Sequence, residues 1–506
     1  MKKKIIYILS ITATILFTSC DGFLNQMPDN RTELNNAEKV AQLLVSAYPT
    51  GTYVQMTELM SDNVTDNGPL YTFFNKTVEE SYKWENFTDN QQDTPQFVWE
   101  LYYKSIAAAN HALQFIESVD NPDDYSPHKG EALICRAYAH FILVNIFSQH
   151  YNKQTSTTDL GIPYVEESEK IVEGKYERGT VADVYERINR DIEEALPLIS
   201  DSYYKKSAIK YHFNQKAAYA FAARFNLYYE NYDKCITYAT KAIGNDPEKV
   251  LRDYESYLSF SSNKDVAIEY IQSNPPCNLL LMPAASQWTY NHWGYRTWYR
   301  YAHNMKKLEE TLWGPGPWVD SEYFYPAAKV FGTDRVTYFP KYNLLIEYSD
   351  PVAGTGFLNI VNTVFTTDEA LLCRAEAYVH KKDYVNATKD LAAWYNKRTV
   401  SGVPELTETK IEDYYSTAVS VLTPELNPKF EIADEKQLNF LHCVLHFRRC
   451  ETIHEGLRWF DIRRYGIEVK HAIYGQDDDV LKKDDLRRVI QIPSAVIAAG
   501  MEANPR

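Results

Sequence analysis

Residues 214–247 read NQKAAYAFAARFNLYYENYDKCITYATKAIGNDP. Apolar residues recur there every three or four positions, which places them on one face of each of two α-helices joined near Asn231 and Tyr232. Small residues occupy the places where paired helices come closest, and Pro247 follows. This pattern is typical of a tetratricopeptide repeat, a helix pair of about 34 residues. The small residues are Ala223, Cys235, Ala239 and Ala242.

A second stretch, residues 368–398, repeats this design with the sequence DEALLCRAEAYVHKKDYVNATKDLAAWYNKR. Residues 131–151 are typical of the first helix of a third unit, and residues 181–199 predict another amphipathic helix. We therefore predict a mostly α fold on a tetratricopeptide-like helical-repeat scaffold, with a helical bundle lacking repeat geometry as the alternative. In the second stretch the equivalent positions are held by Ala375, Tyr378, Asp383, Tyr384 and Ala387.

The helical units are separated by long inserts. Residues 251–367 show little helical period and are rich in Gly, Pro and aromatic residues, and residues 401–438 form a second irregular insert. Long loops inside a compact chain are usually functional. We therefore expect residues 20–506 to form one domain, with its ligand region in the aromatic-rich loops near residues 251–367.

The composition is that of an ordinary folded protein, since 45% of the 506 residues are hydrophobic and 24% are charged. The aromatic fraction is high at 14%, with 40 Tyr, 22 Phe and 9 Trp. Because tyrosine joins an apolar ring to a polar hydroxyl group, this excess predicts many side chains that are partly buried and partly exposed to solvent. The formal net charge of -15 argues against nucleic-acid binding, which needs a basic surface.

The N-terminus is typical of an exported lipoprotein. Three lysines, at residues 2–4, precede an uncharged apolar stretch over residues 5–17 that is too short to span a bilayer as a helix. The stretch ends in Phe-Thr-Ser-Cys20, which is similar to a bacterial lipobox, although Phe17 replaces the usual Leu. We predict a signal peptide over residues 1–19 and lipidation, palmitate included, at Cys20. A plain secretory signal is the alternative.

Six cysteines remain after this cleavage, and none of them has Cys-x-x-Cys spacing. Three of them lie inside Ala-rich helical patterns, where a free cysteine behaves as a small buried hydrophobe. We expect all six to be core residues, namely Cys135, Cys235, Cys277, Cys373, Cys443 and Cys450.

Three segments together resemble one protein family. The start of the mature chain, CDGFLNQMP, the predicted helix RRCETIHEGLRWFDIRRY at residues 448–465, and the closing Ile-Pro and Asn-Pro pairs are similar to those of SusD/RagB-type outer-membrane nutrient-binding lipoproteins. With the interspersed tetratricopeptide units, the resemblance covers essentially the whole chain. The Glu-Gly-x-Arg-x-x-Asp core of that family corresponds here to Glu455, Gly456, Arg458 and Asp461.

The resemblance implies a monomeric, mostly helical protein that is lipid-anchored at the outer surface of the cell outer membrane. It also implies a hinged lid on a SusC-like TonB-dependent transporter, where such proteins capture oligosaccharides, or in some members peptides, and perform no chemistry. We therefore predict a glycan-binding lipoprotein that is not an enzyme and needs no cofactor. Two alternatives stay open: a surface glycoside hydrolase, whose paired carboxylates leave no spacing to recognise, and a peptide-binding or protein-assembly lipoprotein of the same fold.

The strongest candidate for ligand binding is the segment WTYNHWGYRTWYRY at residues 288–301. Sugars present C–H faces that pack on aromatic rings and hydroxyl groups that need hydrogen-bond partners, and this segment offers both. The predicted contacts are Trp288, Tyr290, Trp293, Tyr295 and Arg296.

The second candidate is the segment DNVTDNGP at residues 62–69, because in the resembled family the part before the first scaffold helices contributes to the binding face. Its short carboxylates and amides suit hydrogen bonds to vicinal hydroxyls. A calcium loop does not fit, since the glutamate at its twelfth position is absent. The predicted contacts here are Asp66, Asn67, Tyr71 and Trp84.

Other polar patterns favour structural roles. His442 and His446 are four residues apart on a predicted helix, but no third metal ligand accompanies them, so we predict no metal site. Residues 477–485 are typical of a solvated surface loop. A run of charges at three-residue spacing predicts a ladder along one helical face, with pairing across to another helix as a further possibility, made of Glu455, Arg458, Asp461 and Arg464.

Overall fold

The computed structural model describes residues 34–70, 75–167, 176–244, 246–292, 299–318, 324–325, 329–331 and 336–506. The chain divides into two compact units, Met1–Gln42 and Leu43–Arg506. The elements that follow helix α3 (Ala37–Leu44) all lie in the second unit.

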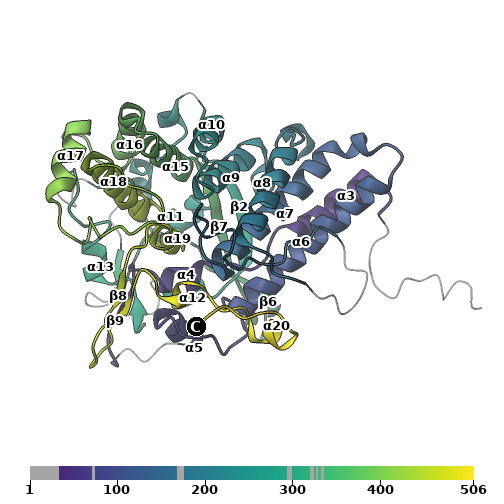
Figure 1. The fold of residues 1–506 in the computed structure, drawn as a ribbon, viewed down its shortest axis with the longest axis horizontal. Coiled ribbons are helices and arrows are strands. Elements are labelled where there is room, and N and C mark those ends of the chain that lie inside the picture. The colour runs from purple at the N-terminus through teal and green to yellow at the C-terminus, as the bar shows by residue number, and fades with distance from the viewer. Residues whose placement is uncertain are drawn as a thin grey trace, which may run out of the picture. The chain divides into compact units, whose positions relative to one another are not determined.

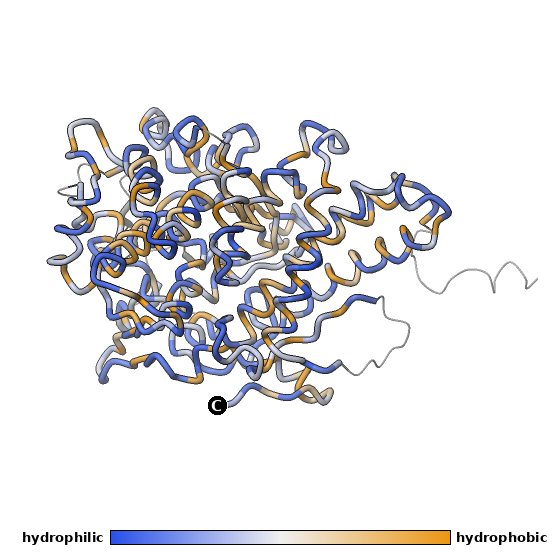
Figure 2. The backbone as a smooth tube through the Cα atoms, turned by 45° about the horizontal axis from the view of Figure 1, so that its top comes forward, coloured by the Kyte–Doolittle hydropathy of each residue, from blue (hydrophilic) through white to orange (hydrophobic). Residues whose placement is uncertain are grey.

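Helices dominate the second unit, so the predicted mostly α fold is confirmed (Figure 1). Hydrophobic and hydrophilic positions alternate along them, as expected for amphipathic helices (Figure 2). Helix α7 packs against both α6 and α8. Side chains of Thr94 and Thr180 cap the first turns of α6 and α8. The three helices are α6 (Pro95–Ser118), α7 (Ser126–Phe147) and α8 (Val181–Ala195).

Two helix pairs follow the same local plan. In the first pair, Glu230 adopts a positive φ of 58° and Asn231 caps the second helix; in the second pair, Lys382 has a φ of 59° and Asp383 is the cap. In each pair, the turn between the helices contains one residue with a left-handed φ, followed by a residue whose side chain caps the second helix. The pairs are α9 (Gln215–Tyr228) with α10 (Tyr232–Ile243), and α15 (Thr367–His380) with α16 (Tyr384–Arg398).

The remaining helices pack around these pairs or form short turns between them. Helix α18 contacts both α15 and α17, and α10 contacts α15, so the pairs are joined into one scaffold (Figure 1). The longer members are α11 (Asn263–Tyr270), α17 (Glu408–Thr417) and α18 (Glu435–Glu451). The shorter ones are α4 (Val54–Leu59), α5 (Lys76–Tyr82), α12 (Trp288–His292), α13 (Met305–Glu309), α19 (Arg458–Arg464) and α20 (Ser494–Ala498).

The insert at residues 251–367, predicted to be irregular, contains a three-stranded antiparallel sheet in the order β2-β7-β6. Strand β7 carries several β-branched and aromatic residues, which favour a pleated strand, and it runs directly into α15. The pairing of β2 with β7 was missed because these strands are far apart in sequence, whereas β6 and β7 form a local hairpin across residues 351–354 that the sequence analysis overlooked. The strands are β2 (Asn278–Ala285), β6 (Leu345–Asp350) and β7 (Thr355–Thr366), with two-stranded ribbons β1 (Thr65–Asp66) with β3 (Tyr301–Ala302), β4 (Lys329–Phe331) with β5 (Val336–Tyr338), and β8 (Val469–His471) with β9 (Asp479–Leu481).

The interior is lined by apolar and small side chains. All six predicted core cysteines are buried and free. Among the described residues one helical stretch, Pro122–Phe147, has the length and apolar composition of a membrane span, but its apolar window is entirely buried inside the protein. It is therefore best explained as a core helix.

A network of buried charges ties the helix pairs to α18. The side chain of Arg448 is fully buried, and its Nε lies 3.0 Å from Oδ2 of Asp461 and 3.7 Å from Oε2 of Glu376. Its Nη1 lies 3.7 Å from Oε1 of Glu369, which also pairs with Arg224 of α9 at 3.0 Å. Four helices thus meet on one set of paired charges.

The predicted helix over residues 448–465 is broken, and the predicted charge ladder is therefore wrong. Helix α18 ends at Glu451 and α19 begins at Arg458, with a turn between them in which His454 and Gly456 have φ values of 68° and 71°. Because the turn redirects the chain, the charges pair mainly with other elements. The pairs are Glu455 with Lys341, Arg458 with Asp62, Asp461 with Arg448, and Arg464 with Glu376.

We expect Gly456→Ala to lower the free energy of unfolding by about 2–5 kcal/mol, measured by urea denaturation. A Cβ at this position would meet Oγ1 of Thr57 at 2.3 Å, and the alanine would have to adopt the positive φ of Gly456. Gly475→Ala is the control, since its φ is 73° but no atom lies within 4 Å of the added Cβ. Equal losses in the two variants would contradict a close-packing role for Gly456.

Candidate functional site

The two segments predicted to bind ligand meet in space. Strand β1 pairs antiparallel with β3, so that Thr65 lies opposite Ala302 and Asp66 opposite Tyr301. The backbone N–H of Asn67 extends the pairing by donating to the carbonyl of Arg300 at 2.7 Å. We call this contact between residues 65–68 and 299–304 the β1–β3 junction.

Asp66 holds the junction together through an ion pair. Nε and Nη2 of Arg300 each donate to one of its carboxylate oxygens at 2.8 Å, and the backbone N–H groups of Gly68 and Tyr474 donate to the same carboxylate. Burial raises the pKa of Asp66, but these hydrogen bonds outweigh it and hold the pKa below its usual value. The carboxylate is thus charged and internally satisfied, which makes it a positioning group in this structure.

Asn67 is likewise used inside the junction. Its Nδ2 donates to the carbonyl of Tyr299 at 3.1 Å, and its Oδ1 accepts from Nδ2 of Asn304 at the same distance. Both predicted residues of this segment therefore fix the path of the aromatic segment. Direct contact of Asp66 or Asn67 with a ligand stays a prediction.

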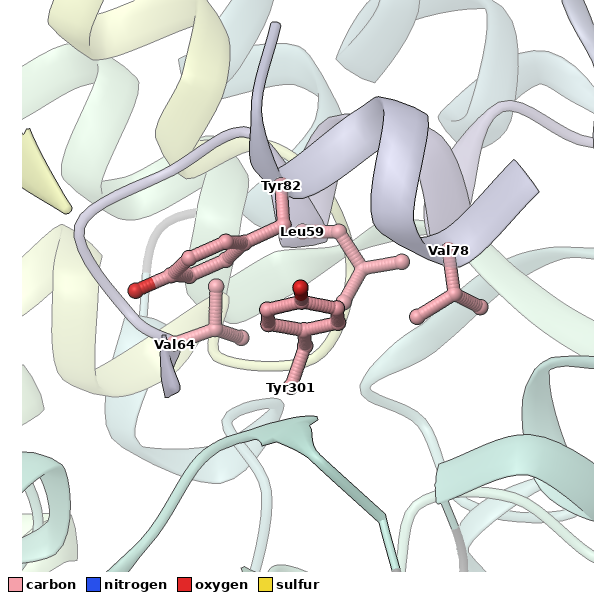
Figure 3. Packing of buried hydrophobic residues seen from close by; sticks show 5 residues of the cluster. All are labelled: Leu59, Val64, Val78, Tyr82 and Tyr301. Atoms are coloured by element: carbon pink, nitrogen blue, oxygen red, sulfur yellow. The ribbon is translucent and has the colours of Figure 1, made fainter. Parts of the chain in front are cut away.

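Four rings stack next to the junction. The ring centroids of Trp84 and His471 are 4.1 Å apart, those of His471 and Tyr82 are 4.1 Å apart, and those of Tyr82 and Tyr301 are 4.4 Å apart. His471 and Tyr301 must lie on opposite faces of Tyr82, because one face cannot hold both rings at this distance. Figure 3 shows Tyr82 and Tyr301 with the apolar side chains beside them, namely Leu59, Val64 and Val78.

Arginines lie near both ends of this ring stack. The guanidinium of Arg300 is 5.1 Å from the ring of Tyr301, and that of Arg487 is 5.5 Å from Trp84. Arg487 is held by both carboxylate oxygens of Asp479, so residues 477–485 are more structured than the solvated loop predicted. Sequence reasoning missed both arginines, although Arg300 alternates with rings in the aromatic segment and could have been found there.

His471 also went unrecognised, since nothing in its spacing marks it. Its Nδ1 lies 2.6 Å from the carbonyl oxygen of Tyr82 and its Nε2 lies 2.8 Å from that of Ser61. A neutral imidazole can donate to only one of these. Burial lowers the pKa of His471 to about 4, against the pull of the two carbonyls.

Trp84 joins the ring stack to an open cavity. Its Nε1 donates to the carbonyl of Met60 at 2.9 Å, and the residue is 4% exposed, so only a small part of its surface is accessible from the cavity. The cavity has a volume of 520 Å³, within the range of small-molecule sites. Its lining mixes amides, carboxylates, cations and apolar groups: Lys83, Trp84, Glu85, Asn86, Ile473, Gln476, Asp477, Asp479, Arg487 and Arg506.

Trp288 and Tyr290 lie on the short helix α12. Trp288 is 4% exposed and packs in a cluster with Val54, Tyr342 and Ile360. Its ring face is therefore covered by protein, whereas Tyr290 is half-buried. Their role as ligand contacts stays a prediction. Five other predicted residues lie outside the described residues, namely Cys20, Tyr71, Trp293, Tyr295 and Arg296.

The histidine pair on α18 is buried in the scaffold. His446 Nδ1 lies 2.8 Å from the hydroxyl of Tyr415, and burial lowers the pKa of His442 to about 4. Within the described ranges, no group of three or more His, Cys, Asp or Glu side chains has the arrangement of a metal site.

Comparison with known families identifies the chain. A family model described as "Starch-binding associating with outer membrane" matches residues 22–227, and one described as "SusD family" matches residues 284–497. The chain belongs to the SusD family. The resemblance noted from the sequence is thereby confirmed. No curated protein matches the sequence.

Solved structures show the same fold at low sequence identity. A SusD superfamily protein from Bacteroides thetaiotaomicron matches with a TM-score of 0.67 at 18% identity, covering 93% of this chain and 100% of that one. A SusD-like carbohydrate binding protein from Bacteroides vulgatus has a TM-score of 0.64 at 19% identity, covering 92% and 97%. A SusD superfamily protein from Parabacteroides distasonis has a TM-score of 0.62 at 16% identity, covering 93% and 99%. The SusD-type fold therefore extends over nearly the whole chain.

We expect the protein to lose stability on acidification, with His471 as one source. An unfolded histidine has a pKa near 6.5, whereas that of folded His471 is about 4, so the unfolded state binds the extra proton first. The free energy of unfolding should therefore fall as the pH drops from 7 to 5, by about 2 kcal/mol for this residue.

Urea denaturation of the protein and of His471→Gln at pH 7 and pH 5 measures this contribution. The variant should be less stable at pH 7, because it loses the stacking, but should lose less on acidification. Other buried histidines, such as His140 and His303 with pKa values near 3, keep part of the slope in both proteins. An identical acid-induced loss would contradict the role given to His471.

Proposed function

We propose that this SusD-family protein binds oligosaccharides at the outer surface of the outer membrane and delivers them to a SusC-like TonB-dependent transporter, acting as its lid. The observation that carries the proposal is the match of two SusD-type family models over most of the chain, one of them described as starch-binding. The carbohydrate-binding description of a structural relative from Bacteroides vulgatus supports it.

The chemistry of the candidate site supports the same class of ligand. Asn86 and Gln476 line the cavity together with Trp84, and their amides suit hydrogen bonds to the hydroxyl groups of a sugar. Nearby cations and carboxylates are present in equal number around the cavity, so a neutral ligand is favoured over a strongly charged one. The site is proposed to bind without performing chemistry.

Titration with a panel of neutral oligosaccharides, maltooligosaccharides included, tests the proposal. We expect saturable binding, weakened about fivefold or more by Asn86→Ala because a hydrogen bond from its amide to the ligand contributes on the order of 1 kcal/mol. Tyr348→Ala is the control, since this ring is 52% exposed on strand β6, outside the residues proposed to bind. Absence of binding to every glycan, or specific binding of peptides alone, would refute the proposal.

The same incubations separate binding from catalysis. Chromatography of each oligosaccharide after incubation should recover it unchanged. Turnover would instead support the surface glycoside hydrolase, since two carboxylates on distant segments are enough for that reaction.

Membrane attachment is proposed to depend on Cys20. We expect the full chain to incorporate a labelled palmitate analogue and to fractionate with the outer membrane, because several acyl chains together anchor a protein stably. Cys20→Ala should lose the label and the membrane attachment, whereas Cys277→Ala serves as a control at a buried cysteine. A labelled Cys20→Ala variant would contradict lipidation at this residue.

A further inference from the structure

A second cavity adjoins the one at Trp84, and Asn86 lines both. The second cavity has a volume of 460 Å³, beside 520 Å³ for the first. It is lined by Asn86, Phe87, Thr88, Asp89, Asn90, Pro95, Gln96, Gln491, Ile492, Pro493, Ser494 and Ile497. Its walls are the segment before α6 on one side and the segment containing α20 on the other. We call the two cavities together the Asn86 groove.

The wall before α6 is held at both ends. Trp84 is fixed by its bond to Met60, and Thr88 is fixed because its Oγ1 donates to Oε1 of Glu80 at 2.6 Å. Asn86 lies between these anchors, with its Oδ1 accepting from Nε of Arg506 at 3.2 Å. The groove is thus formed by a preorganised segment, which lowers the entropic cost of binding.

The opposite wall is fixed by Gln491. Its Oε1 accepts from the backbone N–H of Asn504 at 2.7 Å, and its Nε2 donates to the backbone carbonyl of the same residue at 3.0 Å. Arg178 donates to the side-chain oxygen of Asn504 at 2.8 Å. These bonds link the chain just before Ile492-Pro493 to Asn504, which precedes Pro505. They thereby fix both ends of the segment that contains α20.

Polar groups without protein partners face this groove. Across the part of the chain that the structure describes, Nδ2 of Asn86, the side-chain amide of Gln476 and Oγ of Ser494 make no hydrogen bond to protein. Asp89 is the single charged residue around the second cavity. In the first cavity, Arg487 pairs with Asp479, and the lining cations and carboxylates are equal in number, so their formal charges cancel. Amides and hydroxyls beside apolar rings, with little net charge, match an uncharged polyhydroxylated chain.

We propose that the Asn86 groove binds a linear neutral oligosaccharide that passes over Asn86, with sugar units in both cavities. The inference rests on the proposed glycan binding and adds that affinity depends on chain length. The amide of Asn86 donates to the chain at the crossing point, and the ring of Phe87, which is half-buried, supports a sugar face in the second cavity.

Calorimetric titration with a length series of one linear neutral glycan, from disaccharide to heptasaccharide, tests the proposal. The wild-type protein should bind the longest member about tenfold or more tightly than the disaccharide. Ser494→Trp should abolish this gain while leaving disaccharide binding within about twofold, because it fills only the second cavity. Ser494 is exposed, so the variant should fold, as circular dichroism will check.

Ala498→Trp is the matched control, since it lies exposed on the same helix but lines neither cavity. Asn90→Trp blocks the second cavity from the opposite wall and should reproduce the effect of Ser494→Trp. The groove proposal is overturned if the affinity of the wild-type protein does not rise with glycan length, or if both blocking variants keep that rise. The proposed glycan binding would stand in either case. Failure of the wild-type protein to bind any glycan refutes the proposed function itself.

Discussion

The buried guanidinium of Arg448 is the constraint on which the rest of the structure depends. Carboxylates from α15 and α19 surround it, and among them Glu376 is also paired with Arg464. Burial raises the pKa of Glu376, but the two arginines outweigh it and lower the pKa to about 2. Because loss of one member leaves its partners buried and unpaired, at a cost of about 3–5 kcal/mol, the network fixes how α15 docks on α18.

This constraint reaches the candidate site through the turn after α18. The carboxylate of Glu58 accepts from the backbone N–H groups of His454 and Gly456 at 2.9 and 3.0 Å, and Arg458 pairs with Asp62 at 2.8 Å. Helix α4 and the segment leading to β1 are therefore attached to the charged scaffold. The position of the β1–β3 junction therefore follows from the packing of the helices. The contacts of Glu58 and Asp62 that transmit this packing involve the turn after α18 and helix α19, not the two helix pairs.

Prediction from the sequence succeeded where the determining contacts are local. The helix pairs are encoded in periodicity and small residues within about 34 positions, so they could be recognised. The pairing of β2 with β7, the Asp66–Arg300 pair and the stacking of Trp84 on His471 join residues far apart in the chain, and no local pattern records them. The charge ladder failed for a related reason, since three-residue spacing defines a face only while the helix continues, and Gly456 interrupts it.

The ring stack has a consequence for the order in which the protein folds. Tyr82, Tyr301 and His471 come from three distant parts of the chain, so stacking them requires the closure of two very long loops. The helix pairs close only short turns and are expected to form early. We therefore expect the ring stack to assemble late, after most of the scaffold is in place. A chain that ended before β8 would keep both helix pairs but would lack His471 and the cavity walls formed by residues 473–506.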